Sequence, residues 1–137
     1  MIATTIEQSK KLVELGIDAS TADMTIEKVS HGLTQDFKWE LTVGLDAAIK
    51  ENLFSYRNGF VVPAWSLSAL LELMPLINEY NVEYRPIIER YNDDGWACKY
   101  YNEETRNTND IYIRRYGRTP LDATVEMIIW LKENRYI

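Results

Sequence analysis

The stretch VEYRPIIERYNDDGWACKYY, residues 82–101, constrains the fold more than any other part of the chain. Two runs rich in β-branched and aromatic residues flank NDDG at 92–95, and an Asp-Gly pair between such runs is typical of a tight turn. The stretch therefore predicts an antiparallel hairpin. Because Pro86 has no amide hydrogen to donate, its strand is expected at a sheet edge or with a bulge. IYIRRY, at 111–116, predicts a third strand of this group.

A second β signal lies at residues 37–43, FKWELTV, where apolar residues at odd-numbered positions alternate with polar ones. One face of this strand is therefore apolar and the other polar. Residues 44–62 carry weaker signals: 46–54 is compatible with a short helix, and RNG at 57–59 indicates a turn. The polar residues 102–110 predict a loop.

Residues 4–17, TTIEQSKKLVELGI, predict a helix. Thr4 and Glu7 fit a capping box, in which each side chain bonds a free amide of the first turn. Gly16 suits the left-handed residue past the helix end, with Ile17 folding back on the last turn.

Ser66, in VPAWSLSALLELMP, is either a nucleophile on a sharp turn or the start of a helix. A nucleophile elbow needs glycines on both sides of the serine, and this stretch has none. The leucines and methionine of the stretch recur at helical spacing, and Trp65 precedes the cap as a hydrophobic staple requires. We therefore interpret Ser66 as a helix N-cap, with Pro75 ending or kinking the helix.

The last element, TPLDATVEMIIWLKENRYI, predicts a helix that begins with Thr119 as its cap and Pro120 at its first position. Its inner stripe is expected at Leu121, Val125, Ile128 and either Leu131 or Lys132. The order of helix, strands, helix, three strands and helix predicts an α+β fold. We expect a mainly antiparallel sheet of about four to five strands, packed with three main helices as a sandwich. A single domain over residues 1–137 is the natural expectation for this length.

Composition limits the partners and the setting. The formal net charge of −6 argues against broad adhesion to nucleic acid or to anionic membranes. The first residues lack the apolar run of a signal peptide, and no apolar stretch approaches the roughly 20 residues that span a bilayer. One cysteine excludes an intramolecular disulfide. We expect a cytoplasmic protein with no membrane association.

Three segments, EQSKKLVELGIDASTADM, PAWSLSALLELMP and TPLDATVEMIIWLKEN, resemble parts of small uncharacterised proteins of gut bacteria and their prophages. The Asp-Gly turn, GWACKYY, TPLDA and the closing helix are similar to phage-type α-β-α sandwich domains of unknown function. These segments cover about half of the chain, and residues 25–61 have no counterpart. The resemblance implies a fold and a phage or mobile-element setting, and it implies no established activity or catalytic residues.

Few residues offer reactive chemistry. His31 is the only histidine, so a nucleophile–histidine set would have to use it. Cys98 lies within a predicted strand, where a buried, inert thiol is expected. With one histidine and one cysteine, the four nitrogen and sulfur ligands of a structural zinc site cannot be assembled in one chain. Turn chemistry explains Asp93 and Asp94. We expect no metal, no cofactor and no catalytic residues.

The strand IYIRRY is the feature that most favours a function. Alternation places Tyr112, Arg114 and Tyr116 on one face, with the isoleucines toward the core. Trp96 and Tyr100 share one phase of their own strand and extend this stripe if the register allows. Arginine beside aromatic residues is typical of protein interfaces and of sites that stack single-stranded nucleic acid. Alternatively, a helix covers this face and the tyrosines are half-buried.

Our leading hypothesis is a small, non-catalytic binding module, an accessory protein of a phage or mobile element that acts through another protein or through self-association. The second hypothesis is a single-stranded nucleic-acid-binding protein that uses the aromatic and arginine face, although the net acidity disfavours it. The third is a small enzyme that uses His31.

Overall fold

The computed structural model describes residues 2–30, 37–43, 61–102 and 111–137. The class is α+β, as the sequence predicted, with every strand pair antiparallel. The strands form two sheets, of three and four strands, where one sheet of four to five was expected. The chain divides into two compact units, Met1–Ala69 and Leu70–Ile137. The single domain over residues 1–137 stays a prediction.

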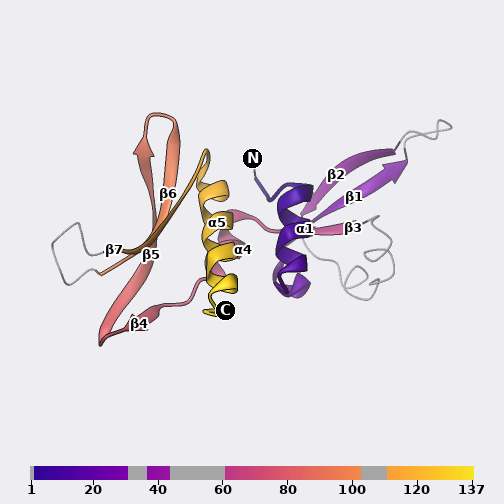
Figure 1. Cartoon of the computed structure of the whole chain (residues 1–137). Helices are drawn as coiled ribbons and strands as arrows, with labels where there is room; N and C mark the ends of the chain where they lie inside the picture. The colour runs from indigo at the N-terminus through magenta and orange to yellow at the C-terminus, as the bar shows by residue number, and fades with distance from the viewer. Residues whose placement is uncertain (1, 31–36, 44–60, 103–110) are drawn as a thin grey trace. The chain divides into compact units, whose positions relative to one another are not determined.

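Within its described residues, the first unit contains the helix α1 and a three-stranded sheet in the order β2-β1-β3 (Figure 1). A 3₁₀ turn between helix and sheet covers Ala19–Thr21. The other elements are α1 (Ile6–Glu14), β1 (Met24–Ser30), β2 (Phe37–Val43) and β3 (Val61–Ala64). The predicted strand at 37–43 is confirmed as β2. The predicted short helix at 46–54 and the turn at 57–59 lie outside the described residues.

The capping of α1 differs by one residue from the prediction. Thr5, and not Thr4, is the N-cap: its side chain accepts the Gln8 amide, and the Gln8 side chain accepts the Thr5 amide. Thr4 is buried instead, where its hydroxyl bonds Ser9 at 2.7 Å and accepts the Trp65 amide at 3.0 Å. The hydroxyl of Thr4 is therefore committed to the interior of the unit and is not available to cap.

The end of α1 follows the prediction. Gly16 has a φ of 93°, which is the left-handed region that only glycine enters without strain. The Ile17 amide bonds the Leu12 carbonyl at 3.0 Å, which closes the helix as a Schellman motif does. The apolar face of the helix packs on the sheet, where Ala3, Ile26 and Ala64 form a buried cluster with Ile6 and Met24.

The second unit is a four-stranded sheet in the order β4-β5-β6-β7, with α5 against it (Figure 1). Its elements are β4 (Ile77–Glu79), β5 (Val82–Asn92), β6 (Gly95–Tyr101), β7 (Ile111–Gly117) and α5 (Pro120–Glu133). A short helix, α4 (Leu67–Glu72), spans the boundary between the units. The predicted hairpin is confirmed as β5 and β6. Most of the predicted loop, residues 103–110, lies outside the described part of the chain.

Pro86 lies where the sequence analysis placed it. Strand β4 pairs with β5 only as far as the Ile77–Tyr84 pair. Further along β5, Pro86 pairs with Tyr100 of β6 and has no β4 residue on its other side. An imide nitrogen is tolerated there because no second strand requires its hydrogen. A bulge between Arg90 and Asn92 also interrupts the register further along β5.

α5 buries the predicted stripe against the sheet. The Thr119 side chain accepts the Asp122 amide at 3.1 Å, and Pro120 follows as the first helical residue. Four residues of the predicted stripe are at most 3% exposed: Leu121, Val125, Ile128 and Leu131. Lys132, the alternative to Leu131, is partly exposed. Gly117 lets the helix start this close to β7, because a Cβ there would lie 2.3 Å from the Ala123 nitrogen.

Candidate binding face

Ser66 caps α4, as predicted. Its hydroxyl accepts the Ala69 amide at 3.2 Å and donates to one carboxylate oxygen of Asp23. The other oxygen of Asp23 accepts the Ser66 amide at 2.8 Å. The hydroxyl thus donates its proton to Asp23 and accepts the Ala69 amide, and both bonds fix the start of the helix, so Ser66 is not poised as a nucleophile.

Cys98 is fully buried, in agreement with the prediction of an inert thiol. Burial raises the pKa of the thiol to about 12, and a hydrogen bond with Thr124 of α5 offsets part of that shift. The thiolate, which is the reactive form, is therefore scarce at neutral pH. His31, on which the enzyme hypothesis depends, lies outside the described residues.

No group of three or more histidine, cysteine, aspartate or glutamate side chains within the described ranges is arranged to hold a metal ion. Among the helices of those ranges, none combines the length and the apolar character that crossing a bilayer requires.

The β6–β7 register divides the five residues that the sequence placed in one stripe. Directly opposed residues share a face of a sheet, and Tyr100 opposes Ile113 while Lys99 opposes Arg114. Tyr100 therefore points to the α5 side, where it is fully buried and donates to the Pro75 carbonyl at 2.8 Å. Burial also raises the pKa of its phenol.

Trp96 lies on the α5 side as well, because it is four residues from Tyr100 along β6. It opposes Arg90 of β5, whose guanidinium carbon lies 5.7 Å from the centre of the indole ring. The expectation that Trp96 and Tyr100 extend the stripe is therefore wrong, since the register places them behind it.

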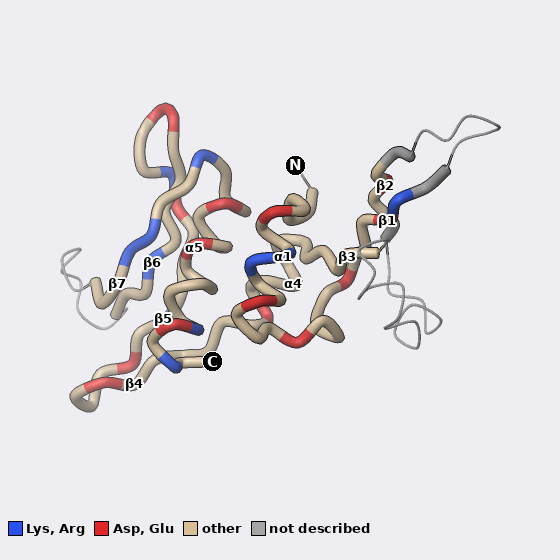
Figure 2. Tube along the Cα trace, turned by 45° about the vertical axis from the view of Figure 1, so that its right-hand side comes forward, with Lys and Arg blue, Asp and Glu red and all other residues tan. Residues whose placement is uncertain are grey.

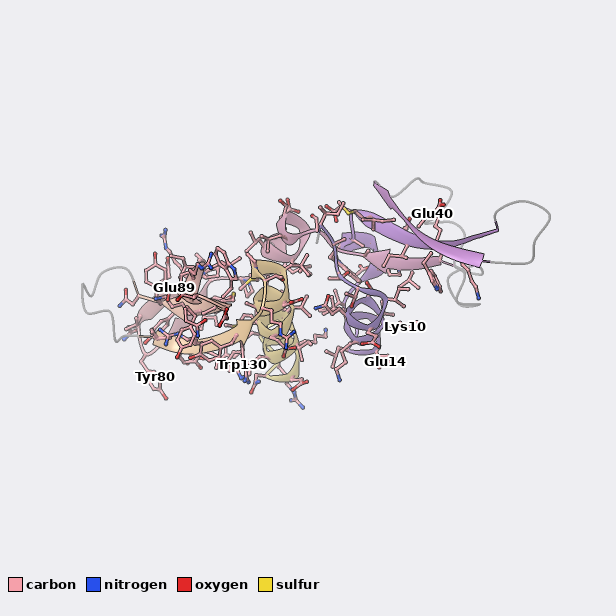
Figure 3. All side chains as sticks on the ribbon, turned by 90° about the horizontal axis from the view of Figure 1, so that it is seen from above. Lys10, Glu14, Glu40, Tyr80, Glu89 and Trp130 are labelled. Atoms are coloured by element: carbon pink, nitrogen blue, oxygen red, sulfur yellow. The ribbon has the colours of Figure 1, made fainter. Side chains whose placement is uncertain are left out.

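Tyr112 also departs from the stripe, because a bulge interrupts the alternation. Tyr100 pairs with Ile113 and Tyr101 pairs with Ile111, so Tyr112 is the extra residue between them. Its ring lies 5.1 Å from that of Tyr84 and 6.3 Å from that of Trp130 on α5, which Figure 3 labels. The expectation that Tyr112 lines an outward face with Arg114 is wrong.

The hydroxyl of Tyr112 is used on that side of the sheet. It shares a hydrogen bond with the hydroxyl of Tyr136, which also donates to Glu79 at 3.3 Å. The bond to Tyr112 is the main cause that raises the pKa of Tyr136. The two tyrosines thus link β7, the residues after α5 and β4 into one aromatic and polar cluster.

Arg114 and Tyr116 stay on the face away from α5. On this face the carboxylate of Glu89, labelled in Figure 3, lies 2.8 Å from Lys99 Nζ and 4.0 Å from an Nη of Arg114. The side chain of Lys99 is only 14% exposed. Lys99 and Glu89 therefore form a close ion pair in which the lysine is largely covered, with the guanidinium of Arg114 beside it.

Tyr91 completes this face at the end of β5. Its ring centre lies 4.7 Å from that of Tyr116, and the guanidinium carbon of Arg114 lies 6.0 Å from the Tyr91 ring. Both tyrosines are large and accessible, 53% and 49% exposed. We name this set, Glu89, Tyr91, Lys99, Arg114 and Tyr116, the Tyr/Arg face.

Three members of the Tyr/Arg face were missed from the sequence: Glu89, Tyr91 and Lys99. Their phase along β5 and β6 is visible in the sequence, since Glu89 and Tyr91 are two residues apart. The register between two strands decides which alternate residues of one strand lie on the same face of the sheet as those of the next. That register depends on the bulges between Arg90 and Asn92 and between Tyr100 and Tyr101.

Charge is unevenly distributed in this unit. Basic residues outnumber acidic ones on β5, β6 and β7: Arg85, Arg90, Lys99, Arg114 and Arg115 against Glu83 and Glu89. On α5 the ratio is reversed, with Asp122, Glu126 and Glu133 against Lys132. Figure 2 shows blue along β6 and β7 and red on α5. The strands are thus locally basic within an acidic chain.

Comparisons with protein-family models, with curated proteins and with solved structures found no significant match.

Proposed function

We propose that the chain is a small, non-catalytic binding module that engages another protein through the Tyr/Arg face. The observation that carries this proposal is the pair of exposed rings, Tyr91 and Tyr116, packed together beside Arg114. A tyrosine that is half exposed leaves about half of its surface in contact with water. Its removal from water by a partner supplies free energy that the isolated chain does not use.

The residue types agree with this role. Tyrosine and arginine are the side chains most often found at the energetic centres of protein interfaces, together with tryptophan. The mutual packing of Tyr91, Tyr116 and Arg114 restricts their rotamers before a partner arrives. Binding then loses less side-chain entropy than it would with three independent side chains.

The chemistry of the nucleophile candidates also favours binding over catalysis. Ser66 is engaged by Asp23 and Ala69, and the Cys98 thiol is buried with a raised pKa. The setting we propose, a cytoplasmic accessory protein of a phage or mobile element, rests on the resemblance of the sequence to prophage proteins.

Affinity capture with a matched surface variant tests the function. The immobilised full chain and the triple variant Tyr91→Ala/Arg114→Gln/Tyr116→Ala are exposed to the same gut-bacterial lysate. The expected result is a stoichiometric partner retained by the original chain and lost by the variant. The control is Tyr80→Ala, which removes a 91% exposed tyrosine at the β4–β5 turn and should leave capture unchanged. Equal capture by all three proteins would reject the Tyr/Arg face.

Single-stranded nucleic acid is the second candidate, because exposed rings beside cations are also how such strands are held. Four residues were expected to bind such a strand. Arg114 and Tyr116 lie on the face away from α5, whereas Trp96 and Tyr112 lie on the α5 side of the sheet. Glu89, at the centre of that face, would repel phosphates. A mobility shift of an oligothymidine at low salt, weakening steeply as salt is added, would favour this candidate over a protein partner.

A further inference from the structure

We infer that the partner presents an acidic polypeptide segment, one carboxylate of which binds Arg114 on the Tyr/Arg face. This inference rests on the proposed function and specifies the chemistry of the partner.

Of the two cations beside Glu89, Arg114 is the one that lies too far from this carboxylate for a direct hydrogen bond. Glu89 is 2.8 Å from Lys99, which is a hydrogen-bonding distance, but 4.0 Å from the nearest Nη of Arg114, which is too long for a direct hydrogen bond. The Nε of Arg114 is buried and has no hydrogen-bond partner within the described part of the chain. The fold therefore leaves one donor of this guanidinium, the Nε–H group, unsatisfied.

The position of the guanidinium suits a carboxylate. Its carbon lies over the ring of Tyr91 and the side chain keeps 30% of its surface exposed. Arginine presents paired donors in one plane, which match the two oxygens of a carboxylate. Tyr91 and Tyr116 then flank the anion and cover the apolar atoms next to it.

The charges favour a carboxylate over a phosphate chain. Lys99 and Arg114 with Glu89 leave one positive charge on the face, which one carboxylate neutralises. A nucleic-acid strand carries a charge at every nucleotide and would bring a second phosphate toward Glu89. The surplus of basic residues on β5, β6 and β7 attracts an acidic segment to these strands despite the net charge of −6.

The Nε–Hε resonance of Arg114 in a ¹⁵N correlation spectrum of the full chain tests this inference. The probe is a blocked peptide of sequence GEVEG, and its matched control is GQVQG, which has the same shape without charge. The expected result is a saturable shift with the glutamate peptide and an at least tenfold weaker response to the glutamine peptide. Arg114→Lys keeps the charge but loses the paired donors. The affinity of this variant for GEVEG, measured from the shifts of its backbone resonances, should be at least fivefold weaker.

Equal responses to the two peptides, or none to either, would overturn the inference. Tighter binding of an eight-nucleotide oligothymidine than of GEVEG would overturn it in favour of phosphate recognition. The two proposals are separable: if capture of a partner is lost with Tyr91→Ala but unchanged with Arg114→Lys, the proposed function stands and the carboxylate inference fails. Backbone dispersion in the same spectra verifies that each variant is folded.

Discussion

Lys99 and Arg114 lie directly opposite each other across the β6–β7 pair, two cations in adjacent positions on the face away from α5. Like charges in this position destabilise a sheet. Glu89 of the neighbouring strand offsets the repulsion through its contact with Lys99 at 2.8 Å. The Tyr/Arg face is therefore held together by a carboxylate that the sequence alone does not connect with either cation.

Glu89→Gln should lower the free energy of unfolding by about 1–3 kcal/mol, because it leaves Lys99 largely covered and without its counter-charge. Chemical denaturation of the variant and the original chain measures the loss, which should shrink as salt screens the two cations. The matched control is Glu83→Gln, which removes a 2.9 Å pair with Arg85 whose side chains are 55% and 44% exposed. An exposed pair contributes about 0–1 kcal/mol, so a larger loss for Glu83→Gln than for Glu89→Gln would contradict this account.

Gly117→Ala should destabilise the fold by about 3 kcal/mol, because the added methyl group meets backbone atoms that cannot rotate away. Its Cβ would lie 2.3 Å from the Ala123 nitrogen and 2.7 Å from two atoms of Asp122. Gly95→Ala is the control, since the nearest atom to that Cβ is a side-chain oxygen of Asn92 at 3.3 Å. Thermal unfolding of the two variants should show a much larger drop for Gly117→Ala, and similar drops would mean that α5 does not start against β7.

Ser66→Ala should cost about 1–2 kcal/mol of stability, because it removes the cap of α4 and one of the two bonds to Asp23. Ser68→Ala, at an exposed position of the same helix, should have almost no effect. Urea denaturation of the two variants measures the difference. If the Ser66→Ala variant were as stable as Ser68→Ala, the role of Ser66 as the cap of α4 would be rejected. Its interpretation as a nucleophile would then be open again.

Stability should fall as the pH rises above about 9. The Cys98 thiol has an ordinary pKa of 9.0 and a folded pKa of about 12, so between these values the unfolded chain ionises while the folded chain does not. The loss is at most about 1.4 kcal/mol per pH unit for this group, and its contribution is fully present below pH 9. Denaturation at pH 8, 9 and 10 should show a flatter decline for Cys98→Ala. An identical decline in both proteins would indicate that the thiol is not desolvated.

Local signals in the sequence predicted the elements that form most of the second unit. The turn at Asp93-Asp94, the cap at Thr119 and the stripe of α5 each depend on residues near one another, so each could be assigned without the rest of the fold. The division into two sheets could not, because β3 and β4 are short strands with no alternating pattern of their own. Thr4 was assigned to a cap because its distant partner, the Trp65 amide, is not visible from the local pattern.

The candidate site could be predicted only in part, because the sequence shows the alternation within a strand but not the pairing between strands. Alternation along β7 correctly joined Arg114 and Tyr116, because the strand is regular between them. It failed at Tyr112, where the bulge adds a residue and turns the ring toward α5, and at Trp96, whose face depends on pairing between strands. Tyr91 was missed because it is the extra residue of the bulge in β5, and its contact with Tyr116 of β7 crosses the sheet.

Site-specific photocrosslinking tests the central claim, that the Tyr/Arg face is the binding surface, most directly. Benzoylphenylalanine is placed at position 91, 116 or 80 of the full chain, and the chain is irradiated in a gut-bacterial lysate. The account predicts that positions 91 and 116 crosslink the same protein while position 80, at the exposed β4–β5 turn, does not. Crosslinking from position 80 alone, or from none of the three, would contradict it.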